Sequence, residues 1–509
     1  MRALGPTFRP YEWAPSTADL AEAAGLEPVE IVRFDGNVAA SPPRSARPGA
    51  IAGALARVHT YPHGGYPDLV DAIAGYAGVE PENVVLGAGA DDLILLCARA
   101  FGGPGDVVAV PPRPTYSLFA VAAALTGAVL GEGHEAAVTF ACRPNNPTGS
   151  LDPLPEDRPL VVDEAYFEYC GETATPLLED GVVVIRTFSK AFGLAGARVG
   201  YALADAETAA ELNARQAPAP ISTISAALAL AAISDPPDVG LVVEERDRMA
   251  EELRALGLEP EPSAANFVFV RIPEPRTVSD ALLRRGLVVR TLEEGIRISV
   301  LDREDDDLLL AALADVLDRP AAARPAGRRA RLVRATAETR IAVRLGIDGS
   351  GLVRVSTGAG LYDHLLEQLA FHGGLDLVLE GAGDLETGDH HTAEDAAIAL
   401  GQALDRALGD RRGIARFGDG VVPMDDALAR AAVDLGGRAA TEIRLEHDPG
   451  LARHVLESFA QSGRLALHVE STGRDDHHVA EAAFKATGRA LRAALRVESN
   501  EIPSTKGLL

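Results

Sequence analysis

The chain contains the same short cluster of metal-binding residue types twice. Each copy has two adjacent histidines and a glutamate three positions after the second: His390, His391 and Glu394 in the first, and His477, His478 and Glu481 in the second. At the start of a helix, this glutamate can share a face with either histidine. Adjacent helical residues point about 100° apart, so the two imidazoles of a pair cannot easily bind one ion. The doubled cluster therefore predicts two metal sites, each drawing on both copies.

Helix capping is the alternative interpretation of adjacent histidines. For a single cluster, helix capping would explain the residues as well as metal binding does. The repetition at equal spacing favours metal binding, as do His364 in "LYDHLL" and His468 in "LALHVE". Imidazole and carboxylate ligands suit Mn, Fe, Zn or Ni, and the affinity order alone does not choose among these metals.

The residues after each cluster continue in a helical pattern. Apolar side chains recur on one face of each predicted helix: Leu400, Leu404 and Leu408 after the first cluster, and Phe484, Leu491 and Leu495 after the second. Both helices can thus pack on a sheet while their first turns hold the ligands at an edge. Upstream, the alternating segment 339–357 predicts an antiparallel hairpin, with Asp348-Gly349 as its turn.

The whole of 331–509 resembles the imidazoleglycerol-phosphate dehydratase family of histidine biosynthesis. The matching motifs follow in order: "ET" (338–339), "DHLLEQLAFHG" (363–373), "GDHHTAED", "ALGDRRGIARFG" (407–418), "PMDDALARAAVDLGGR" (423–438), "DDHHVAEAAFKATGRALR" and the tail "IPSTKGLL". The resemblance implies an α+β domain built from a duplicated sheet-helix unit. It also implies a hollow 24-subunit shell whose active sites are shared between subunits.

The same resemblance implies a ligand set and a substrate-binding set. Two manganese ions per active site would be held by His364, His390, His391, Glu394, His468, His477, His478 and Glu481. The substrate would be bound by Glu338, His372, Arg416, Arg438 and the tail residues Ser504, Thr505 and Lys506.

The expected chemistry suits these residue types. Dehydration of imidazoleglycerol phosphate removes a proton from a carbon that no carbonyl activates, and metals on the imidazole nitrogens would make the ring an electron sink. A glutamate can move the protons, with Glu481 the first candidate and Glu394 the second. In an acidic protein the substrate phosphate needs local cations, for which Arg416, Arg438 and Lys506 are candidates. The alternative for the tail is a frayed end.

The N-terminal part contains a lysine in a Ser/Gly-rich loop, together with three other motifs. These motifs are "RTFSKAFGLAGARVGYAL" (186–203), "CRPNNPTG" (142–149), "LVVDEAYFEY" (160–169) and "VVLGAGADDLILL" (84–96). Short β-branched runs alternate with Ala/Leu-rich helical segments, which predicts buried strands of a mostly parallel sheet. The last motif is a strand, a loop and a helix start, where unpaired amides can bind an anion.

In this order the motifs resemble fold-type I pyridoxal-phosphate (PLP) aminotransferases, especially histidinol-phosphate aminotransferase, over about 30–318. The resemblance implies an α/β fold with a small C-terminal α/β subdomain. Lys190 would form the Schiff base and shuttle protons, and Asp163 would keep the pyridine nitrogen protonated. The remaining cofactor contacts would be Asn146 and Tyr166 at the phenolic oxygen, Tyr116 stacked on the ring, and Thr187, Ser189, Arg198, Ala90 and Asp91 at the phosphate.

Three further residues would act on the substrate side or across subunits. Arg297 would clamp the carboxylate of the amino donor, a bidentate task suited to guanidinium. Asn266 would lie near the same pocket, and Tyr61 would reach the cofactor phosphate of a partner subunit in an aminotransferase dimer. Two departures stand out: the family's N-terminal "NENPxGP" appears only as "DGNVAASPP" (35–43), and the short interval between Asn146 and Asp163 predicts a trimmed helix.

Composition and charge indicate a two-domain cytoplasmic protein. The chain has 509 residues, a net charge of −26 and three cysteines, which argues against nucleic-acid and membrane partners and against a disulfide framework. The Pro/Ala/Arg-rich segment 319–330 predicts a linker between domains 1–318 and 331–509. Its basic run, Arg328, Arg329 and Arg331, is better explained as a solvated tether than as an RNA-binding patch.

The two resemblances together predict a bifunctional enzyme, because the ketone released by a dehydratase is the one that the aminotransferase would aminate with glutamate. Its partners would be small phosphate esters and glutamate. Three alternatives remain open. The N-terminal half could be a PLP-dependent decarboxylase of amino-acid phosphates, or an inactive scaffold, and the C-terminal half could be a metal-storage shell.

Overall fold

The computed structural model describes residues 13–26, 28–39, 43, 48–62, 64–112, 114–131, 133–320, 328–349, 353–499 and 501. The chain forms two compact units. The first contains the described residues of 1–20 and 32–322, and the second those of 21–31 and 323–509. None of the described helices combines the length and apolar composition that crossing a bilayer requires.

A seven-stranded sheet forms the centre of the first unit, with the order β2-β8-β7-β6-β5-β3-β4. The strands from β3 to β7 pair in parallel, and β8 pairs antiparallel with both β2 and β7. The strands are β2 Val84–Gly87, β3 Val107–Ala109, β4 Val129–Gly131, β5 Val138–Cys142, β6 Leu160–Asp163, β7 Val182–Thr187 and β8 Gly200–Leu203. The predicted mostly parallel sheet is therefore confirmed.

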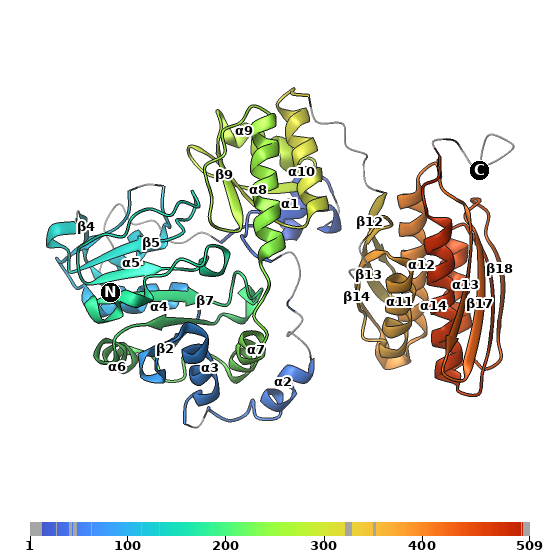
Figure 1. Ribbon diagram of the computed structural model, residues 1–509, viewed down its shortest axis with the longest axis horizontal. Coiled ribbons are helices and arrows are strands. Elements are labelled where there is room, and N and C mark those ends of the chain that lie inside the picture. The colour runs from blue at the N-terminus through green and yellow to red at the C-terminus, as the bar shows by residue number, and fades with distance from the viewer. Residues whose placement is uncertain are drawn as a thin grey trace. The chain divides into compact units, whose positions relative to one another are not determined.

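Helices cover both faces of this sheet (Figure 1). Because side chains alternate along a strand, Val184 packs with α3 (Pro67–Ala77) and α7 (Thr223–Ile233). Its neighbour Val183 packs on the opposite face with α4 (Ala90–Phe101), α5 (Leu118–Thr126) and α6 (Ala206–Arg215). Residues 143–159, between β5 and β6, contain no helix, as the short interval predicted.

A smaller sheet, β1-β10-β11-β9, completes the first unit. Its strands are β1 Val32–Phe34, β9 Phe267–Arg271, β10 Leu287–Thr291 and β11 Gly295–Ser299. The other α-helices of residues 13–316 are α1 Thr17–Ala24, α2 Pro48–Leu55, α8 Gly240–Ala255, α9 Pro275–Leu283 and α10 Arg303–Val316. Because β1 pairs in parallel with β10, the residues that follow β1 are brought beside β11.

Short 3-10 helices connect several of these elements. They are η1 Pro28–Glu30, η2 Pro81–Asn83, η3 Gly133–Glu135, η4 Phe167–Tyr169, η5 Thr175–Asp180, η6 Ala195–Ala197 and η7 Leu385–Thr387.

The second unit contains two four-stranded sheets with the same topology, β12-β13-β15-β14 and β16-β17-β19-β18. The strands are β12 Arg329–Ala335, β13 Thr339–Gly346, β14 Val353–Ser356, β15 Asp376–Gly383, β16 Phe417–Met424, β17 Ala427–Asp434, β18 Ala440–Leu445 and β19 Ala466–Thr472. The predicted hairpin between 339 and 357 is wrong. β15 lies between β13 and β14, and β14 pairs with it in parallel.

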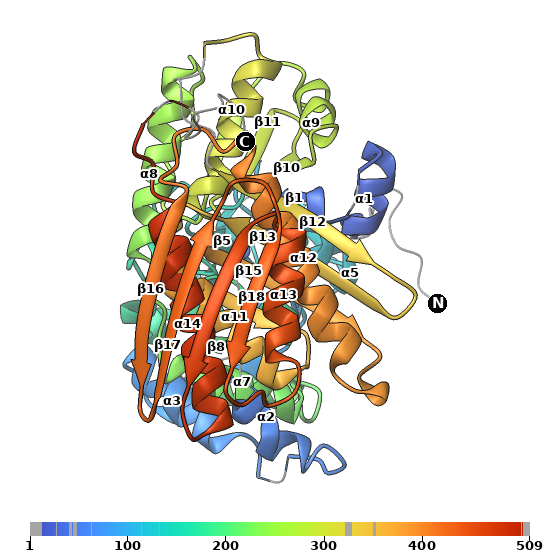
Figure 2. The same cartoon turned by 90° about the vertical axis from the view of Figure 1, so that its right-hand side faces the viewer.

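Four helices lie between the two sheets, and Figure 2 views the second sheet from its outer side. They are α11 Gly360–Gly373, α12 His390–Leu408, α13 Ala452–Ser462 and α14 Asp476–Ala494. The predicted apolar stripes of α12 and α14 are buried, as expected. Helix α11 packs along α14 and α12 along α13. A Cβ at Gly488 or Gly401 would collide with the backbone of the paired helix, so both glycines allow the helices to approach closely.

The predicted linker falls largely on residues 321–327, which lie outside the described residues. The basic run at its end is not a solvated tether. Arg329 and Arg331 belong to β12 and pair with Gly346 and Arg344, while Arg328 donates a hydrogen bond to the carbonyl of Leu495 at 2.8 Å and forms an ion pair with Asp348.

Candidate functional sites

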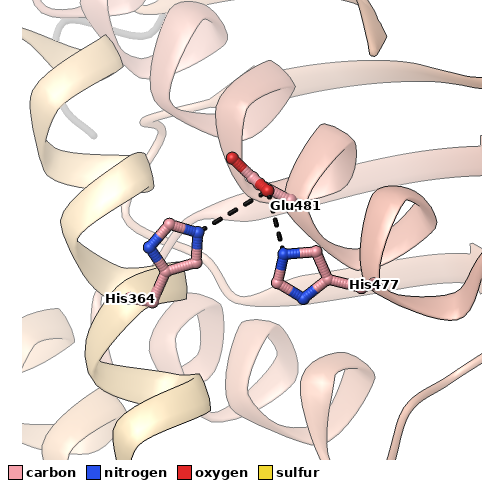
Figure 3. Close-up of side chains that lie close together, drawn as sticks. All are labelled: His364, His477 and Glu481. Carbon is pink, nitrogen blue, oxygen red and sulfur yellow. Dashed lines mark ion pairs between the residues drawn. The ribbon is translucent and has the colours of Figure 1, made fainter. Parts of the chain in front are cut away.

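The second unit brings two histidines and a glutamate together at the start of α14 (Figure 3). His477 and Glu481 lie one turn apart on α14, and His364 comes from α11. The Nε2 atoms of His364 and His477 lie 3.5 and 3.2 Å from Oε2 of Glu481, and the two imidazole rings stack at 5.7 Å. The other oxygen, Oε1, lies 2.8 Å from the Lys485 ammonium.

A second cluster repeats this arrangement at the start of α12. Nε2 of His390 lies 3.6 Å from Oε2 of Glu394, and Nε2 of His454, from α13, lies 3.2 Å from Oε1. The His454 nitrogen is buried and makes no hydrogen bond to another described residue. Within each cluster, one donor atom from every residue lies within 4.8 Å of the others. Each cluster therefore offers three converging donors to one ion.

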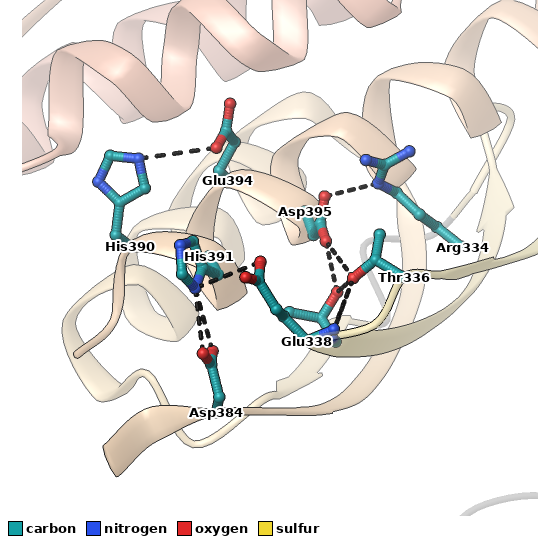
Figure 4. A network of polar contacts seen from close by, with 9 residues as sticks. Arg334, Thr336, Glu338, Asp384, His390, His391, Glu394 and Asp395 are labelled. Carbon is teal, nitrogen blue, oxygen red and sulfur yellow. Dashed lines mark hydrogen bonds and ion pairs between the residues drawn. The ribbon is translucent and has the colours of Figure 1, made fainter. Parts of the chain in front are cut away.

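His391 and His478 point away from these clusters and toward carboxylates. Nδ1 of His391 lies 3.1 Å from Oδ2 of Asp384 and 3.5 Å from Oε2 of Glu338, as Figure 4 shows. Nδ1 of His478 lies 2.7 Å from Oδ1 of Asp426. These carboxylates raise the pKa of both imidazoles. The two histidines of each pair thus face different partners.

A polar network fixes the turn that carries Glu338 against the first turn of α12 (Figure 4). Asp395 accepts a hydrogen bond from Nε of Arg334 at 2.6 Å and another from the hydroxyl of Thr339. The hydroxyl of Thr336 in turn accepts from the Glu338 amide at 3.2 Å. This network accounts for the position of Glu338 beside His391.

The sequence motifs did not identify His454 as a candidate ligand. His468, which they did identify, does not join either cluster. Along β19 the side chains alternate, so the buried neighbours Leu467 and Val469 direct His468 to the opposite, exposed face of the sheet. There it lines a surface pocket of about 510 Å³ with Arg430 and Arg444, away from the helices. An isolated histidine carries little signal, but "RHVLESFA" repeats the pattern of "DHLLEQLA" around His364.

The expected substrate-binding residues of this unit are dispersed. Half-buried His372 lies on α11, where burial and the charges of Lys485 and Arg489 lower its pKa. Arg416 pairs with Asp434 at 2.7 Å, just before the first residue of β16. The turn that holds Asp426 follows the other end of β16, and the two ends of this strand are about 24 Å apart. Arg438 is exposed near that same far end. Ser504, Thr505 and Lys506 lie outside the described residues.

In the first unit, the predicted catalytic groups converge at the carboxyl ends of β6 and β7. Asp163 is 4% exposed, and burial raises its pKa to about 7. The Lys190 ammonium lies over the ring of Tyr166, 5.6 Å from its centroid. Burial and the nearby charge of Arg297 lower the pKa of Lys190 to about 8. A lysine in this state is readily deprotonated to a nucleophilic amine.

Residues 35–37 form a strap across this site, which the sequence motif alone did not reveal. The carbonyl of Asp35 accepts from Nη2 of Arg297 at 2.7 Å, and that of Gly36 accepts from Nζ of Lys190 at 3.4 Å. Nδ2 of buried Asn37 donates to the Tyr166 hydroxyl at 3.0 Å. The segment "DGN" therefore touches three of the predicted functional residues, although it departs from the family motif.

An anion-binding arrangement lies at the start of α4. Nη2 of Arg198 pairs with Asp91 at 3.1 Å, and its Nη1 donates to the Ser189 hydroxyl at 3.4 Å. The Thr187 hydroxyl donates to Ser189 at 3.0 Å, and Tyr116 donates to Asp91 at 2.7 Å. Position 89 favours glycine, because its backbone has φ 89° and ψ 173°, a conformation that residues with a Cβ rarely adopt.

Arg297 occupies the substrate side of the site. Its Nη1 donates to Oδ1 of Asn146 at 2.5 Å, burial lowers its pKa, and its Nε is buried without a hydrogen-bond partner among the described residues. Oδ1 of Asn266 is likewise unpaired there. Arg290, directly opposite Arg297 in the β10–β11 pairing, adds a second guanidinium that was not predicted. Tyr61 is 84% exposed, and its predicted role toward a partner subunit stays a prediction.

Comparisons with known proteins assign each unit. Residues 33–313 match aminotransferase class I and II, and residues 357–491 match imidazoleglycerol-phosphate dehydratase. An imidazoleglycerol-phosphate dehydratase from Methanothermobacter thermautotrophicus is 52% identical over 190 residues, which cover 36% of this chain and 98% of that protein. The chain belongs to both families.

Solved structures resemble the aminotransferase unit. Histidinol-phosphate aminotransferase from Sinorhizobium meliloti, in complex with pyridoxal-5'-phosphate, is 28% identical with a TM-score of 0.53, over 62% of this chain and 98% of that chain. L-threonine-O-3-phosphate decarboxylase from Porphyromonas gingivalis shares the fold at 20% identity and a TM-score of 0.50, over 57% and 100%.

The residues of both units fit the groups that these families use. In the aminotransferase unit, Lys190 and Asp163 could hold PLP at its aldehyde and ring nitrogen, and the start of α4 could hold its phosphate. The unpaired polar atoms of Arg297 and Asn266 suit a polar ligand. In the dehydratase unit, Nε2 of His454 is buried and makes no hydrogen bond to a described residue, which suits a metal ion. The mixed imidazole-carboxylate sets suit a first-row transition metal.

Proposed function

We propose that the chain catalyses two consecutive steps of histidine biosynthesis. The dehydratase unit converts imidazoleglycerol phosphate into imidazole-acetol phosphate, and the aminotransferase unit converts this ketone, with glutamate as donor, into histidinol phosphate. The pairing of the two families on one chain carries the proposal, because the product of the first reaction is the substrate of the second. The three cysteines are free, which is compatible with the cytoplasm as the site of both reactions.

For the dehydratase we propose two Mn²⁺ ions per active site. The two clusters supply six ligands: His364, His477, Glu481, His390, Glu394 and His454. His454 takes the place of His468 in this set, and His391 and His478 are the remaining two ligands. When bound, the ions act as Lewis acids on the substrate imidazole. Glu394 and Glu481 are the candidates for moving substrate protons.

An assembled shell would complete this site. Within one chain, the cations proposed for the substrate phosphate, Arg416 and Arg438, lie at the end of the sheet opposite the histidine turns. An active site that contains both metal ions and these arginines therefore needs a second copy of the chain. A 24-subunit arrangement, with aminotransferase units able to dimerise, is the form that we propose.

In the aminotransferase unit each residue has a defined task. PLP, when bound, supplies the electron-accepting ring. Nζ of Lys190 gives and takes the proton at the substrate carbon, and Asp163 holds the proton on the ring nitrogen. The guanidinium of Arg297 binds the donor carboxylate, and Arg290 offers a charge for a substrate phosphate.

Decarboxylation is the second candidate for this unit, because the Porphyromonas gingivalis decarboxylase shares the fold. Supplying the purified chain with imidazole-acetol phosphate and glutamate separates the two activities. We expect stoichiometric 2-oxoglutarate and histidinol phosphate. Release of CO₂ from an amino-acid phosphate without 2-oxoglutarate would instead support the decarboxylase. For the dehydratase unit, loss of dehydration when a chelator removes the metal would exclude a role limited to metal storage.

A further inference from the structure

His391 and His478 lie outside the two clusters described above, although His391 belongs to a third group of possible metal ligands, with Glu338 and Asp384. Each presents the same ring nitrogen, Nδ1, to an aspartate. Nδ1 of His478 lies 2.7 Å from Oδ1 of Asp426, and Nδ1 of His391 lies 3.1 and 3.3 Å from the two oxygens of Asp384. The aspartates come from different places in the repeat, since Asp426 lies in the β16–β17 turn and Asp384 follows β15.

A carboxylate at Nδ1 determines what the other nitrogen can do. The contact requires the proton to be on Nδ1, so that the lone pair lies on Nε2. The carboxylate also makes the imidazole a better donor and fixes the direction of the ring. In the clusters, the histidines face their glutamates through Nε2: His364, His390, His454 and His477. All six imidazoles therefore offer a metal the same nitrogen.

We propose that Asp426 and Asp384 are positioning residues for His478 and His391, and that the contribution of Asp426 is the larger. The proposal rests on the metal sites proposed above. Neither aspartate needs to contact the ion. Each acts by holding its histidine with Nε2 directed toward the ligand position.

Asp426 is itself held firmly. Its side chain is 16% exposed, and Oδ2 accepts the backbone N–H groups of Arg474 and Asp475 at 2.6 and 3.2 Å. Asp475 in turn caps α14 by accepting the amides of His477 and His478 at 2.9 and 3.1 Å. The aspartate thus links the β16–β17 turn, the start of α14 and the imidazole in one hydrogen-bonded unit.

His391 differs from His478 in having two carboxylates near its Nδ1 atom. Its Nδ1 has Asp384 at 3.1 Å and a second carboxylate, Glu338, at 3.5 Å. Loss of Asp384 would leave Glu338 able to take over the N–H group, whereas the second carboxylate beside His478, that of Asp425, faces Nε2 at 3.6 Å and not Nδ1. The two halves of the duplicated domain therefore differ in how strongly each positions its outer histidine.

The test is a Mn²⁺ titration of the full chain after removal of metal, followed by electron paramagnetic resonance of free Mn²⁺. The variants are Asp426→Ala, Asp426→Asn and Asp384→Ala. Asp410→Ala is the control, because it removes one exposed carboxylate that pairs with Arg412 in a loop of the same unit. Thermal melting of every variant checks that the unit is folded.

We expect Asp426→Ala to weaken Mn²⁺ binding by about 10- to 100-fold. Asp426→Asn should be intermediate, because the amide oxygen still accepts the N–H but carries no charge. Asp384→Ala should lose less than Asp426→Ala, and Asp410→Ala should bind as the unchanged chain does. If Asp426→Ala does not fold, Asp426→Asn carries the test, with a loss of about threefold or more as the supporting result.

Unchanged Mn²⁺ affinity in a folded Asp426→Ala or Asp426→Asn variant overturns the inference, as does an equal loss in Asp410→Ala. A larger loss in Asp384→Ala than in Asp426→Ala overturns the asymmetry between the halves. Failure of the unsubstituted chain to bind Mn²⁺ would instead count against the proposed metal sites themselves.

Discussion

The two sites of this chain are built in opposite ways. In the aminotransferase unit the reactive groups come from several elements of one unit, and burial is the first cause of the pKa shifts of Asp163 and Lys190. In the dehydratase unit the side chains of His390 and His477 are 54% and 49% exposed. The pKa of His478 is raised first by its hydrogen bond with Asp426. The proposed groups of the first site lie together within one unit, whereas the two histidine clusters of the second lie at the end of the sheet opposite Arg416 and Arg438. On the proposed function, the first site would need one unit and the second would need a second copy of the chain.

The largest expected effect separates the two units. Lys190→Ala should reduce transamination by about 10⁴-fold or more, because it removes the amine proposed to move the proton at the substrate carbon. Dehydration should remain within about twofold of the unchanged chain, since each unit has its own core. Parallel assays with imidazoleglycerol phosphate and with imidazole-acetol phosphate measure both activities. A matched fall in dehydration would show that the sites are not independent.

The next effect tests the proposed ligand set of the dehydratase, in which His454 takes the place of His468. His454→Ala should lower dehydration and Mn²⁺ affinity by about 100-fold or more, because it removes a proposed metal ligand and not a supporting residue. His468→Ala, on the exposed sheet face, should change Mn²⁺ affinity by less than about threefold. Metal content after gel filtration and steady-state rates provide the measurements. The reverse ranking would restore the ligand set predicted from the sequence.

A smaller effect is expected for the substrate clamp of the aminotransferase. Arg297→Lys should raise the KM for glutamate by about 10- to 100-fold, because an ammonium cannot replace two parallel hydrogen bonds from a guanidinium to a carboxylate. The PLP absorption spectrum should be retained. Arg276→Lys, on an exposed helix start away from the site, serves as the matched control. An unchanged KM would place the carboxylate elsewhere.

The smallest effect concerns the stability of the PLP-free chain. Burial raises the pKa of Asp163 to about 7 from its ordinary value of 3.8. Between these values the folded state holds a proton that the unfolded state has released, so stability is present below pH 4 and is lost as the pH rises to about 7. Asp163→Asn should remove this loss and raise the Tm of the aminotransferase unit by a few degrees at pH 8. Identical Tm profiles against pH would contradict the assignment.

Local motifs predicted the parts of both sites that lie within one element or one loop. Lys190, Asp163 and the two His-His pairs belong to this class, because strand ends and helix starts place such side chains together. Only the repeat of "DHLLEQLA" as "RHVLESFA" marks His454 in the sequence, and its approach to Glu394 depends on the packing of α13 against α12. The direction of His468 follows instead from strand alternation. The wrong hairpin has a similar cause, since alternation in 339–357 shows two strands but not that β15 lies between them.

The most direct test of the central claim is a single reaction that contains the purified chain, Mn²⁺, PLP, imidazoleglycerol phosphate and glutamate. We predict that histidinol phosphate and 2-oxoglutarate form in equal amounts, and that Lys190→Ala instead accumulates imidazole-acetol phosphate. Accumulation of imidazole-acetol phosphate by the unchanged chain, with no 2-oxoglutarate, would contradict the assignment of two consecutive steps to this chain.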